Sequence, residues 1–167
     1  MSIKIKPLLL GVNIDHVATL RQVRRSVYPS VSQAAMEVLK GGADYITIHL
    51  REDRRHIQDF DLVDLLKKGL DVNLEICPSE EMVDIAVNNK PKFCCLVPEK
   101  REELTTEGGL DLINNYNQVE SAVASLSNAG ISVSLFIEPR KEFINAAKSL
   151  KATYVESETK KKTYPHF

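Results

Sequence analysis

Short apolar segments alternate with amphipathic helical patterns along this chain, and this alternation is the feature that most limits its possible folds. Segments of mainly Val, Ile, Leu and Phe are typical of parallel strands that are buried on both faces. Five such segments are residues 8–14, 44–49, 72–76, 93–97 and 132–137, and residues 153–156 form a weaker sixth. The sequence therefore predicts five or six short buried strands.

Helical periodicity fills the intervals between these segments. The clearest example runs from Val31 to Leu39, with apolar residues three and four positions apart, after Ser30 as an N-cap and before Gly41 and Gly42 as a stop. Similar patterns are found at residues 62–66, after Ser79, and at residues 119–126 and 143–150. Strand and helix in alternation indicate βα units and a parallel sheet.

Two α/β architectures are compatible with this order, a doubly wound sheet and a (β/α)8 TIM barrel. No GxGxxG or GxxxxGK motif follows any predicted strand, so a dinucleotide or P-loop site loses its main support and the barrel is favoured. A complete barrel usually takes about 250 residues. A chain of 167 residues holds about five to six units, so we expect an incomplete barrel over residues 1–156 and a polar tail over residues 157–167.

Charge and cysteine usage exclude several classes of function. The 22 basic and 23 acidic residues give a net charge of −1, which argues against a nucleic-acid-binding or polybasic membrane surface. No apolar stretch approaches the roughly 20 residues that a membrane helix needs, and no signal peptide is recognisable, so we expect a cytoplasmic protein. The three cysteines lack zinc-ligand spacing and are expected to be buried, reduced thiols.

Polar side chains gather where the predicted strands end. The carboxyl ends of parallel strands meet at one edge of the sheet, which is where α/β folds bind ligands. A single polar residue there is usually a solvated turn or a helix cap, but here all five of the main strands end in polar residues. These are Asn13, Asp15, His16, His49, Arg51, Glu75, Pro98–Arg101 and Glu138.

Some of these residues suit proton transfer. Asn13 and Asp15, like His49 and Arg51, are two positions apart and would share a strand face if the strand geometry continued that far. Histidine titrates close to neutral pH. Glu75 lies in an otherwise apolar strand, where desolvation would raise the pKa of its carboxyl group and make it a better base near pH 7.

Arginines follow the first two strands, which favours an anionic ligand such as a phosphate ester. The alternative is a solvated surface on which the arginines form ion pairs with Glu52, Asp53, Asp59 and Asp61. Residues 97–111 form a polar loop that is either a closing lid with a glycine hinge or a surface excursion. The arginines are Arg21, Arg24, Arg25, Arg51, Arg54 and Arg55.

Four strings carry a resemblance to a known family. They are GVNIDHVATLRQVR (11–24), ITIHLREDRRHIQD (46–59), NLE (73–75) and FCCLVPEKREELTTEGGLD (93–111). The chain resembles the pyridoxine 5'-phosphate synthase family of vitamin B6 biosynthesis in order from about residue 8 to residue 156. The resemblance implies a (β/α)8 barrel, a homo-oligomer, and condensation of 1-deoxy-D-xylulose 5-phosphate with 3-amino-2-oxopropyl phosphate, with release of phosphate and water.

The same resemblance implies a role for individual residues. His49 and Glu75 would be the acid/base residues that move protons during imine formation and ring closure. Asn13 and Arg24 would bind the aminoketone phosphate, and Asp15 and His16 would lie at the deoxyxylulose phosphate. The remaining sugar-phosphate ligands would be Arg51, His56 and Thr105. Neither a metal nor an organic cofactor is implied.

The chain departs from the family pattern after Glu156. The family continues with a His-Thr-Gly segment and then with units that carry a Gly-His-Gly motif and a glycine-containing phosphate site, whereas this chain reads SETKKKTYPHF. In the family the histidine of the Gly-His-Gly motif is the general acid, and because His166 has no flanking glycines we do not assign that role to it. This departure is compatible with a truncation, a frameshift or a mis-called gene. It leaves two functional hypotheses, a synthase and a remnant that binds a phosphorylated ligand without turnover.

Overall fold

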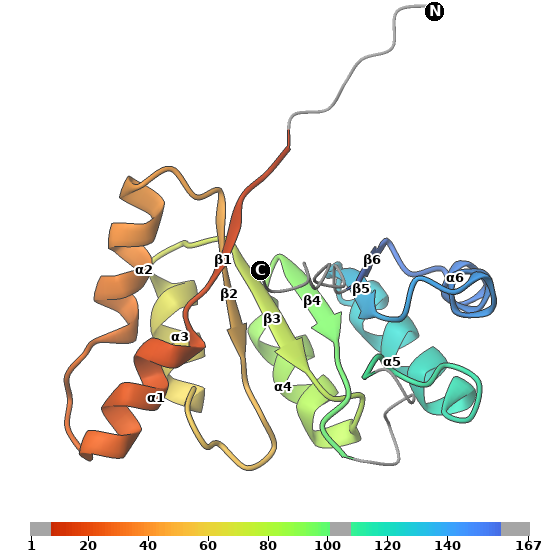
Figure 1. Ribbon diagram of the computed structural model, residues 1–167, viewed down its shortest axis with the longest axis horizontal. Coiled ribbons are helices and arrows are strands. Elements are labelled where there is room, and N and C mark those ends of the chain that lie inside the picture. Colours follow the sequence, from red (N-terminus) through yellow and green to blue (C-terminus); the bar gives the residue numbers. More distant parts are fainter. Residues whose placement is uncertain (1–7, 101–107, 158–167) are drawn as a thin grey trace, which may run out of the picture.

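A computed structural model, which describes residues 8–100 and 108–157, shows a single curled sheet of parallel strands with helices between them (Figure 1). Each strand pairs with its neighbours in the chain, so the order in the sheet is β1-β2-β3-β4-β5-β6. The strands are β1 (Gly11–Asn13), β2 (Tyr45–His49), β3 (Val72–Ile76), β4 (Phe93–Leu96), β5 (Ser132–Phe136) and β6 (Tyr154–Glu156).

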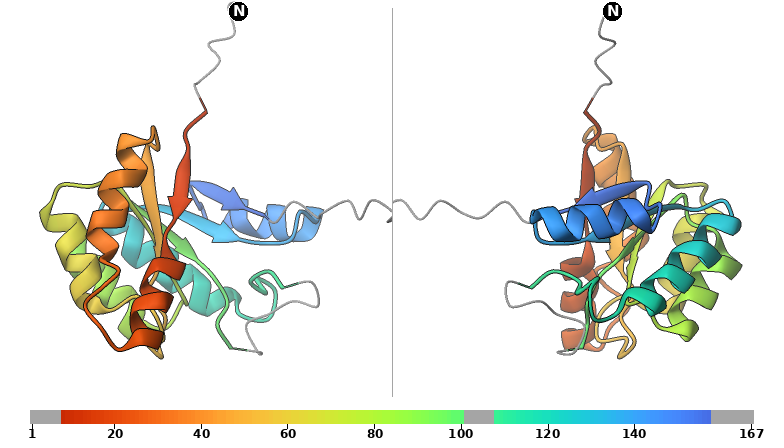
Figure 2. Two further views of the ribbon diagram at one scale, coloured as in Figure 1. Left: turned by 60° about the vertical axis from the view of Figure 1, so that its left-hand side comes forward. Right: turned by 90° about the vertical axis from the view of Figure 1, so that its right-hand side faces the viewer.

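The helices lie on the outer, convex side of this sheet (Figures 1 and 2). Several neighbouring helices contact one another: α1 contacts α2, α2 contacts α3, and α4 contacts α5. Figure 2 shows that the strand direction turns strongly between β1 and β6, which gives the sheet the shape of a half-barrel. The helices are α1 (Asp15–Arg24), α2 (Val31–Lys40), α3 (Asp59–Lys67), α4 (Glu80–Asn89), α5 (Tyr116–Asn128) and α6 (Lys141–Ser149).

Side chains on the two faces of the sheet differ in polarity because successive strand residues point to opposite sides. The convex face carries apolar residues such as Ile48, Leu74 and Leu135, all fully buried in the core beneath the helices. The concave face carries the alternate residues, many of which are polar. The register aligns Thr47 with Asn73 and His49 with Glu75 on that face.

The predicted strands and helices are confirmed, apart from boundaries that shift by a few residues. The first strand shows the largest difference, because β1 covers only Gly11–Asn13 of the predicted residues 8–14. Ser30 caps α2 as expected, since its Oγ accepts a hydrogen bond from the backbone N–H of Gln33 at 3.2 Å. The three cysteines are free and buried, also as expected.

The helix α1 was not predicted from the sequence. Its buried residues are Asp15, Ala18 and Arg21, so its inner face carries two charged side chains and no apolar stripe. Arg21 is tolerated there because its guanidinium forms a bidentate ion pair with Asp61 on α3, at 2.6 and 2.7 Å, and also donates to the carbonyl of His56 at 3.2 Å. Arg21 thus connects α1 to α3 and to the segment after β2.

The half-barrel has two open edges and a hollow concave side. Within the part of the chain that the structure describes, β1 and β6 each pair with one neighbour only. A cavity of about 370 Å³ lies on the concave face and is lined by Tyr45, Asn73, Phe93, Ser134 and Glu156, among others. The described helices include none that is long and apolar enough to span a membrane.

Candidate active site

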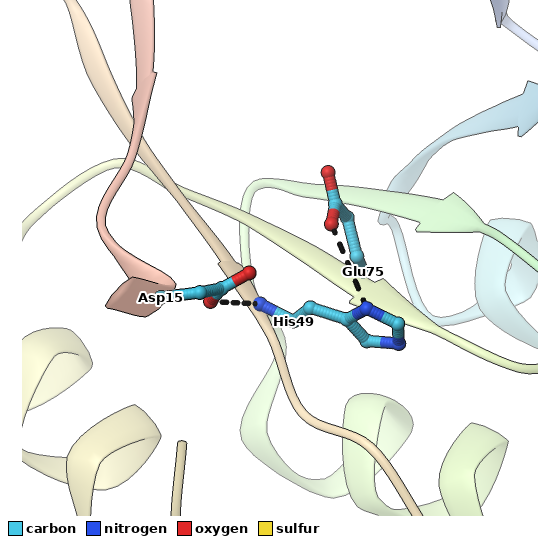
Figure 3. Close-up of side chains that lie close together, drawn as sticks. All are labelled: Asp15, His49 and Glu75. Atoms are coloured by element: carbon cyan, nitrogen blue, oxygen red, sulfur yellow. Dashed lines mark hydrogen bonds and ion pairs between the residues drawn. The ribbon is translucent and has the colours of Figure 1, made fainter. Parts of the chain in front are cut away.

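Three side chains from the carboxyl ends of the first three strands meet at the concave side of the sheet. Asp15 begins α1 directly after β1, His49 ends β2, and Glu75 lies near the end of β3 (Figure 3). The parallel register brings His49 opposite Glu75. Three of the five strand ends that the sequence analysis singled out therefore converge here.

Asp15 is held by hydrogen bonds to both neighbouring strands. Its Oδ2 accepts from the side-chain amide of Asn13 at 2.9 Å, and its Oδ1 accepts from the backbone N–H of His49 at 2.8 Å. Asn13 Oδ1 accepts in turn from the backbone N–H of Asp15 at 2.9 Å. The strand geometry does not continue to Asp15, so this reciprocal pair, rather than a shared strand face, brings the two side chains together.

The imidazole of His49 lies between two carboxylates. Its Nδ1 is 3.9 Å from Glu75 Oε2, and its Nε2 is 3.0 Å from Glu99 Oε1. Only the second distance is that of a hydrogen bond. The His49 side chain is largely buried, as is Glu99, which follows β4. His49 is thereby oriented with one nitrogen engaged and the other facing Glu75.

Burial raises the pKa of Glu75 to about 7, and the negative charges of Asp15 and Glu156 contribute in the same direction. The neighbouring His49 acts in the opposite direction, but burial dominates. A carboxyl group with this pKa exchanges a proton readily near neutral pH, which fits the expectation from its place in an apolar strand.

Two further expected ligands lie beside His49. The ring of His56 is 6.0 Å from the ring of His49, centroid to centroid, and its Nδ1 accepts a hydrogen bond from the backbone N–H of Ile57. Burial lowers the pKa of His56, which favours the neutral ring. Arg51 is 3.4 Å from Asp53 and 3.7 Å from Glu99, and its side chain is mostly buried.

The other expected site residues differ in how closely they approach the cluster formed by Asp15, His49 and Glu75. Asn13 contacts it through Asp15, whereas His16 and Arg24 are exposed residues of α1. Thr105 belongs to residues 101–107 of the polar loop, which lie outside the described residues.

Gly109, in the described part of this loop, lies against the residues after β5. A Cβ atom at Gly109 would be 2.7 Å from the backbone nitrogen of Glu138, so this close approach requires glycine.

The ion-pair alternative holds for four of the six arginines, of which Arg51 pairs with Asp53 as described above. Arg54 pairs with Asp59 at 2.9 Å and Arg55 with Asp53 at 2.6 Å. Arg21 pairs with Asp61, as described above. The guanidinium groups of Arg21, Arg54 and Arg55 are therefore engaged by carboxylates of the chain itself.

Two acidic residues close to His49 and Glu75, Glu99 and Glu156, have no role predicted from the sequence. Glu99 was noted only as part of a polar run after the fourth strand, and nothing in that run distinguishes it. Glu156 accepts a hydrogen bond from Ser134 Oγ at 3.0 Å, and the Asn73 side-chain amide lies 3.5 Å away. The signal for Glu156 was its spacing of two from Tyr154 in β6, which places it on the concave face.

Two groups of three side chains in the described chain have donor atoms within 4.8 Å of one another, the spacing that a metal ion would need. In the first group the Asp15 oxygens already accept from protein N–H groups. In the second group Glu99 accepts from His49 and from a backbone N–H, and burial raises the pKa of the Cys77 thiol to about 11. We assign a metal to neither. The groups are Asp15, His49, Glu75 and Glu52, Cys77, Glu99.

The arrangement is suited to acid/base chemistry. His49 and Glu75 present two titratable groups 3.9 Å apart, one an imidazole and the other a carboxyl group with a pKa near neutrality. Two such groups side by side can donate protons to one face of a small molecule and accept protons from it.

Comparison with solved structures supports the fold and nothing further, because the sequence identities are low. The structure entitled "Native KDPGal structure" matches 99% of this chain and 66% of its own, with a TM-score of 0.55 and 12% identity. A D-allulose 3-epimerase from Methylomonas sp. matches 89% of this chain and 61% of its own, with a TM-score of 0.53 and 12% identity.

Sequence comparison gives a much closer match. The family model described as "Pyridoxal phosphate biosynthesis protein PdxJ" matches residues 10–164. The pyridoxine 5'-phosphate synthase of Pseudoalteromonas translucida is 54% identical over 155 residues, 92% of this chain and 64% of the relative. That of Magnetococcus marinus is 56% identical over 154 residues, 91% of this chain and 63% of the relative.

This chain therefore spans somewhat less than two thirds of the length of these curated relatives. The matched region includes every strand and helix described above. Since the family model covers almost the whole chain and the identities exceed one half, the chain belongs to the PdxJ family of pyridoxal phosphate biosynthesis proteins.

Proposed function

We propose that this chain carries the acid/base centre of a pyridoxine 5'-phosphate synthase, with His49 and Glu75 as its proton-transfer residues. The observation that carries the proposal is the position of Glu75, whose carboxyl group has a pKa of about 7 and lies 3.9 Å from His49 Nδ1. Near pH 7 this carboxyl group exists in both protonation states, so it can serve as a base in one step and as an acid in the next.

The reaction proposed is the condensation of 1-deoxy-D-xylulose 5-phosphate with 3-amino-2-oxopropyl phosphate. Imine formation and ring closure both require protons to move on and off carbon, nitrogen and oxygen, which suits an imidazole and a carboxyl group on one face of a substrate. The names of the relatives support the product, pyridoxine 5'-phosphate, and the family resemblance implies the two substrates. Assembly into a homo-oligomer is proposed from the family resemblance alone, and a cytoplasmic location is proposed from the sequence, in which no signal peptide is recognisable.

The substrate-binding roles follow the same proposal. Arg51 and His56, which flank His49, would hold the sugar phosphate together with Thr105. Asp15 and His16 would lie at the same deoxyxylulose phosphate. Asn13 and Arg24 would bind the aminoketone phosphate. Arg51 suits a phosphate because its guanidinium presents several N–H donors in one plane, and its present contacts at 3.4 and 3.7 Å are long enough to be exchanged.

Turnover by the full 167-residue chain tests the catalytic part. Both phosphorylated substrates are mixed with the chain, and pyridoxine 5'-phosphate and free phosphate are measured together. His49→Ala and Glu75→Gln should each lower the rate by about 10²- to 10⁴-fold. Glu37→Gln, which removes an exposed carboxylate on α2, is the matched control and should keep the wild-type rate.

Calorimetric titration with each substrate alone separates binding from catalysis. Binding of deoxyxylulose phosphate that is weakened at least about tenfold by Arg51→Ala supports the site assignment. Binding without any product from the mixed substrates contradicts catalysis by this chain and favours the alternative, a protein that holds a phosphorylated ligand without turnover. Wild-type rates in both His49→Ala and Glu75→Gln would reject the assigned roles.

A further inference from the structure

The two ring nitrogens of His49 have different surroundings. Nε2 lies at hydrogen-bond distance from Glu99 Oε1, 3.0 Å, whereas Nδ1 is 3.9 Å from the nearest oxygen of Glu75. A carboxylate can only accept hydrogen bonds, so a neutral imidazole bonded to it must carry its proton on the bonded nitrogen. The position of Glu99 therefore fixes which nitrogen of His49 keeps the lone pair.

Glu99 itself is held in place by its second oxygen. Oε2 accepts from the backbone N–H of Glu52 at 3.1 Å and lies 3.7 Å from the guanidinium of Arg51. A backbone N–H and a cation both stabilise the ionised carboxylate. The Glu99 side chain is only 4% exposed, so its orientation is set by the protein and not by solvent.

We propose that Glu99 is a positioning residue that holds His49 in the tautomer protonated on Nε2, so that the unprotonated Nδ1 faces Glu75. The catalytic part of this inference rests on the proposed function. To accept a proton on the side that faces Glu75, His49 needs a free lone pair on Nδ1. Glu99 acts through His49 and is not assigned a contact with substrate. Its carboxylate plays the part that a buried acid plays in orienting a catalytic histidine.

Several other polar groups surround His49, and none of them sets the tautomer in the same way. Asp15 accepts from the backbone of His49, not from its ring. The ring of His56 is in edge contact at a centroid distance of 6.0 Å. Among the described residues, the groups that face His49 are Asp15, Arg51, His56, Glu75 and Glu99.

Nitrogen-15 NMR of the histidine-labelled full chain measures the tautomer directly, without substrate. At a pH high enough for the imidazole ring to be neutral, we expect a protonated Nε2 and an unprotonated Nδ1 for His49. In Glu99→Gln the side-chain amide can donate as well as accept, so the ratio of the two tautomers should fall at least about tenfold. Magic-angle spinning gives the same readout from a sedimented sample if the chain self-associates.

The matched control is Glu52→Gln. Its carboxylate lies in the same cluster but pairs with Lys100 at 2.8 Å and not with His49, so the tautomer ratio should stay at the wild-type value. If Glu99→Gln fails to fold, the wild-type spectrum alone decides, because a proton on Nδ1 of His49 overturns the proposal. An unchanged ratio in folded Glu99→Gln overturns it as well.

The outcome for Glu99 is separable from the outcome for the proposed function. A chain without turnover can still show the Nε2-protonated tautomer, which confirms the positioning role and rejects only the catalytic one. If the chain is active, Glu99→Gln should lower kcat by about 10- to 100-fold and leave KM near the wild-type value. An active chain with the opposite tautomer overturns the role of Glu99 alone.

Discussion

At the scale of single residues, the concave face of the sheet gathers acidic groups that the fold partly desolvates. Glu75 is the clearest case, because burial raises the pKa of its carboxyl group and the charges of Asp15 and Glu156 add to the effect. A carboxylate in such a place destabilises the folded state once it is ionised. The property that suits Glu75 to proton transfer therefore has a cost in stability.

This cost predicts how stability depends on pH. In the unfolded chain Glu75 ionises above about pH 4.5, whereas in the folded chain it stays protonated up to about pH 7. Between these values the folded state binds more protons, so the contribution of Glu75 to stability falls as the pH rises, by about 3 kcal/mol in all. Above pH 7 no further loss is expected from this residue.

The variant Glu75→Gln isolates that contribution. It should be more stable than the wild type by about 3 kcal/mol at pH 8 and nearly equal to it at pH 4, as measured by urea unfolding across this range. The comparison cancels the opposite contribution of His56, whose pKa is lowered by burial. A difference between the two proteins that does not change with pH would contradict the assignment.

Strand ends made part of this site predictable from the sequence. Asp15, His49 and Glu75 all come from strand ends or beside them; the parallel register brings His49 opposite Glu75, and hydrogen bonds hold Asp15 next to His49. Glu99 was included in the run Pro98–Arg101 at the end of the fourth strand, but the same reasoning could not single it out. It follows β4 in a polar loop, and its contact with His49 depends on a path through space that no local pattern encodes.

At the scale of secondary-structure elements, α1 shows where apolar periodicity stops being informative. Its buried face contains Asp15 and Arg21, so the sequence shows charge where a helix usually shows an apolar stripe. Other helices, such as α2 and α5, bury apolar residues and were predicted from their spacing. The ion pair that replaces the stripe joins residues 40 positions apart, and no local sequence pattern predicts such a pair.

The Arg21–Asp61 pair predicts a large difference between two Asp→Asn substitutions in the first turn of α3. Asp61→Asn leaves the buried guanidinium without its carboxylate and should lower the free energy of unfolding by about 3–5 kcal/mol. Asp59→Asn removes an exposed ion pair with Arg54 and should cost at most about 1 kcal/mol. Urea unfolding followed by circular dichroism measures both, and equal losses would contradict a structural role for the buried pair.

At the scale of the whole molecule, the described sheet leaves two edges unpaired. Apolar side chains are exposed at both edges: Leu8, Leu9 and Leu10 precede β1, and Tyr154 and Val155 lie on β6. An open edge presents free N–H and C=O groups to other chains, and apolar side chains beside it strengthen that contact. The half-barrel therefore exposes surface that a closed barrel would cover.

We predict that the isolated 167-residue chain is poorly stable or self-associates through these edges. Light scattering across a concentration series should show association, and Val155→Lys should weaken it because a lysine on an edge strand opposes pairing. Val23→Lys, at an exposed position on α1, is the matched control and should have no effect. A chain that scatters as a monomer at every concentration would contradict the prediction.

The strand order also bears on how such a sheet is made. Because β1 to β6 are neighbours in the sheet in the same order as in the chain, no strand has to insert between two that are already paired. Each new strand can join the free edge left by the one before it, while the ribosome is still supplying the next. Assembly can thus follow synthesis from the N-terminus, with each βα unit serving as the template for its successor.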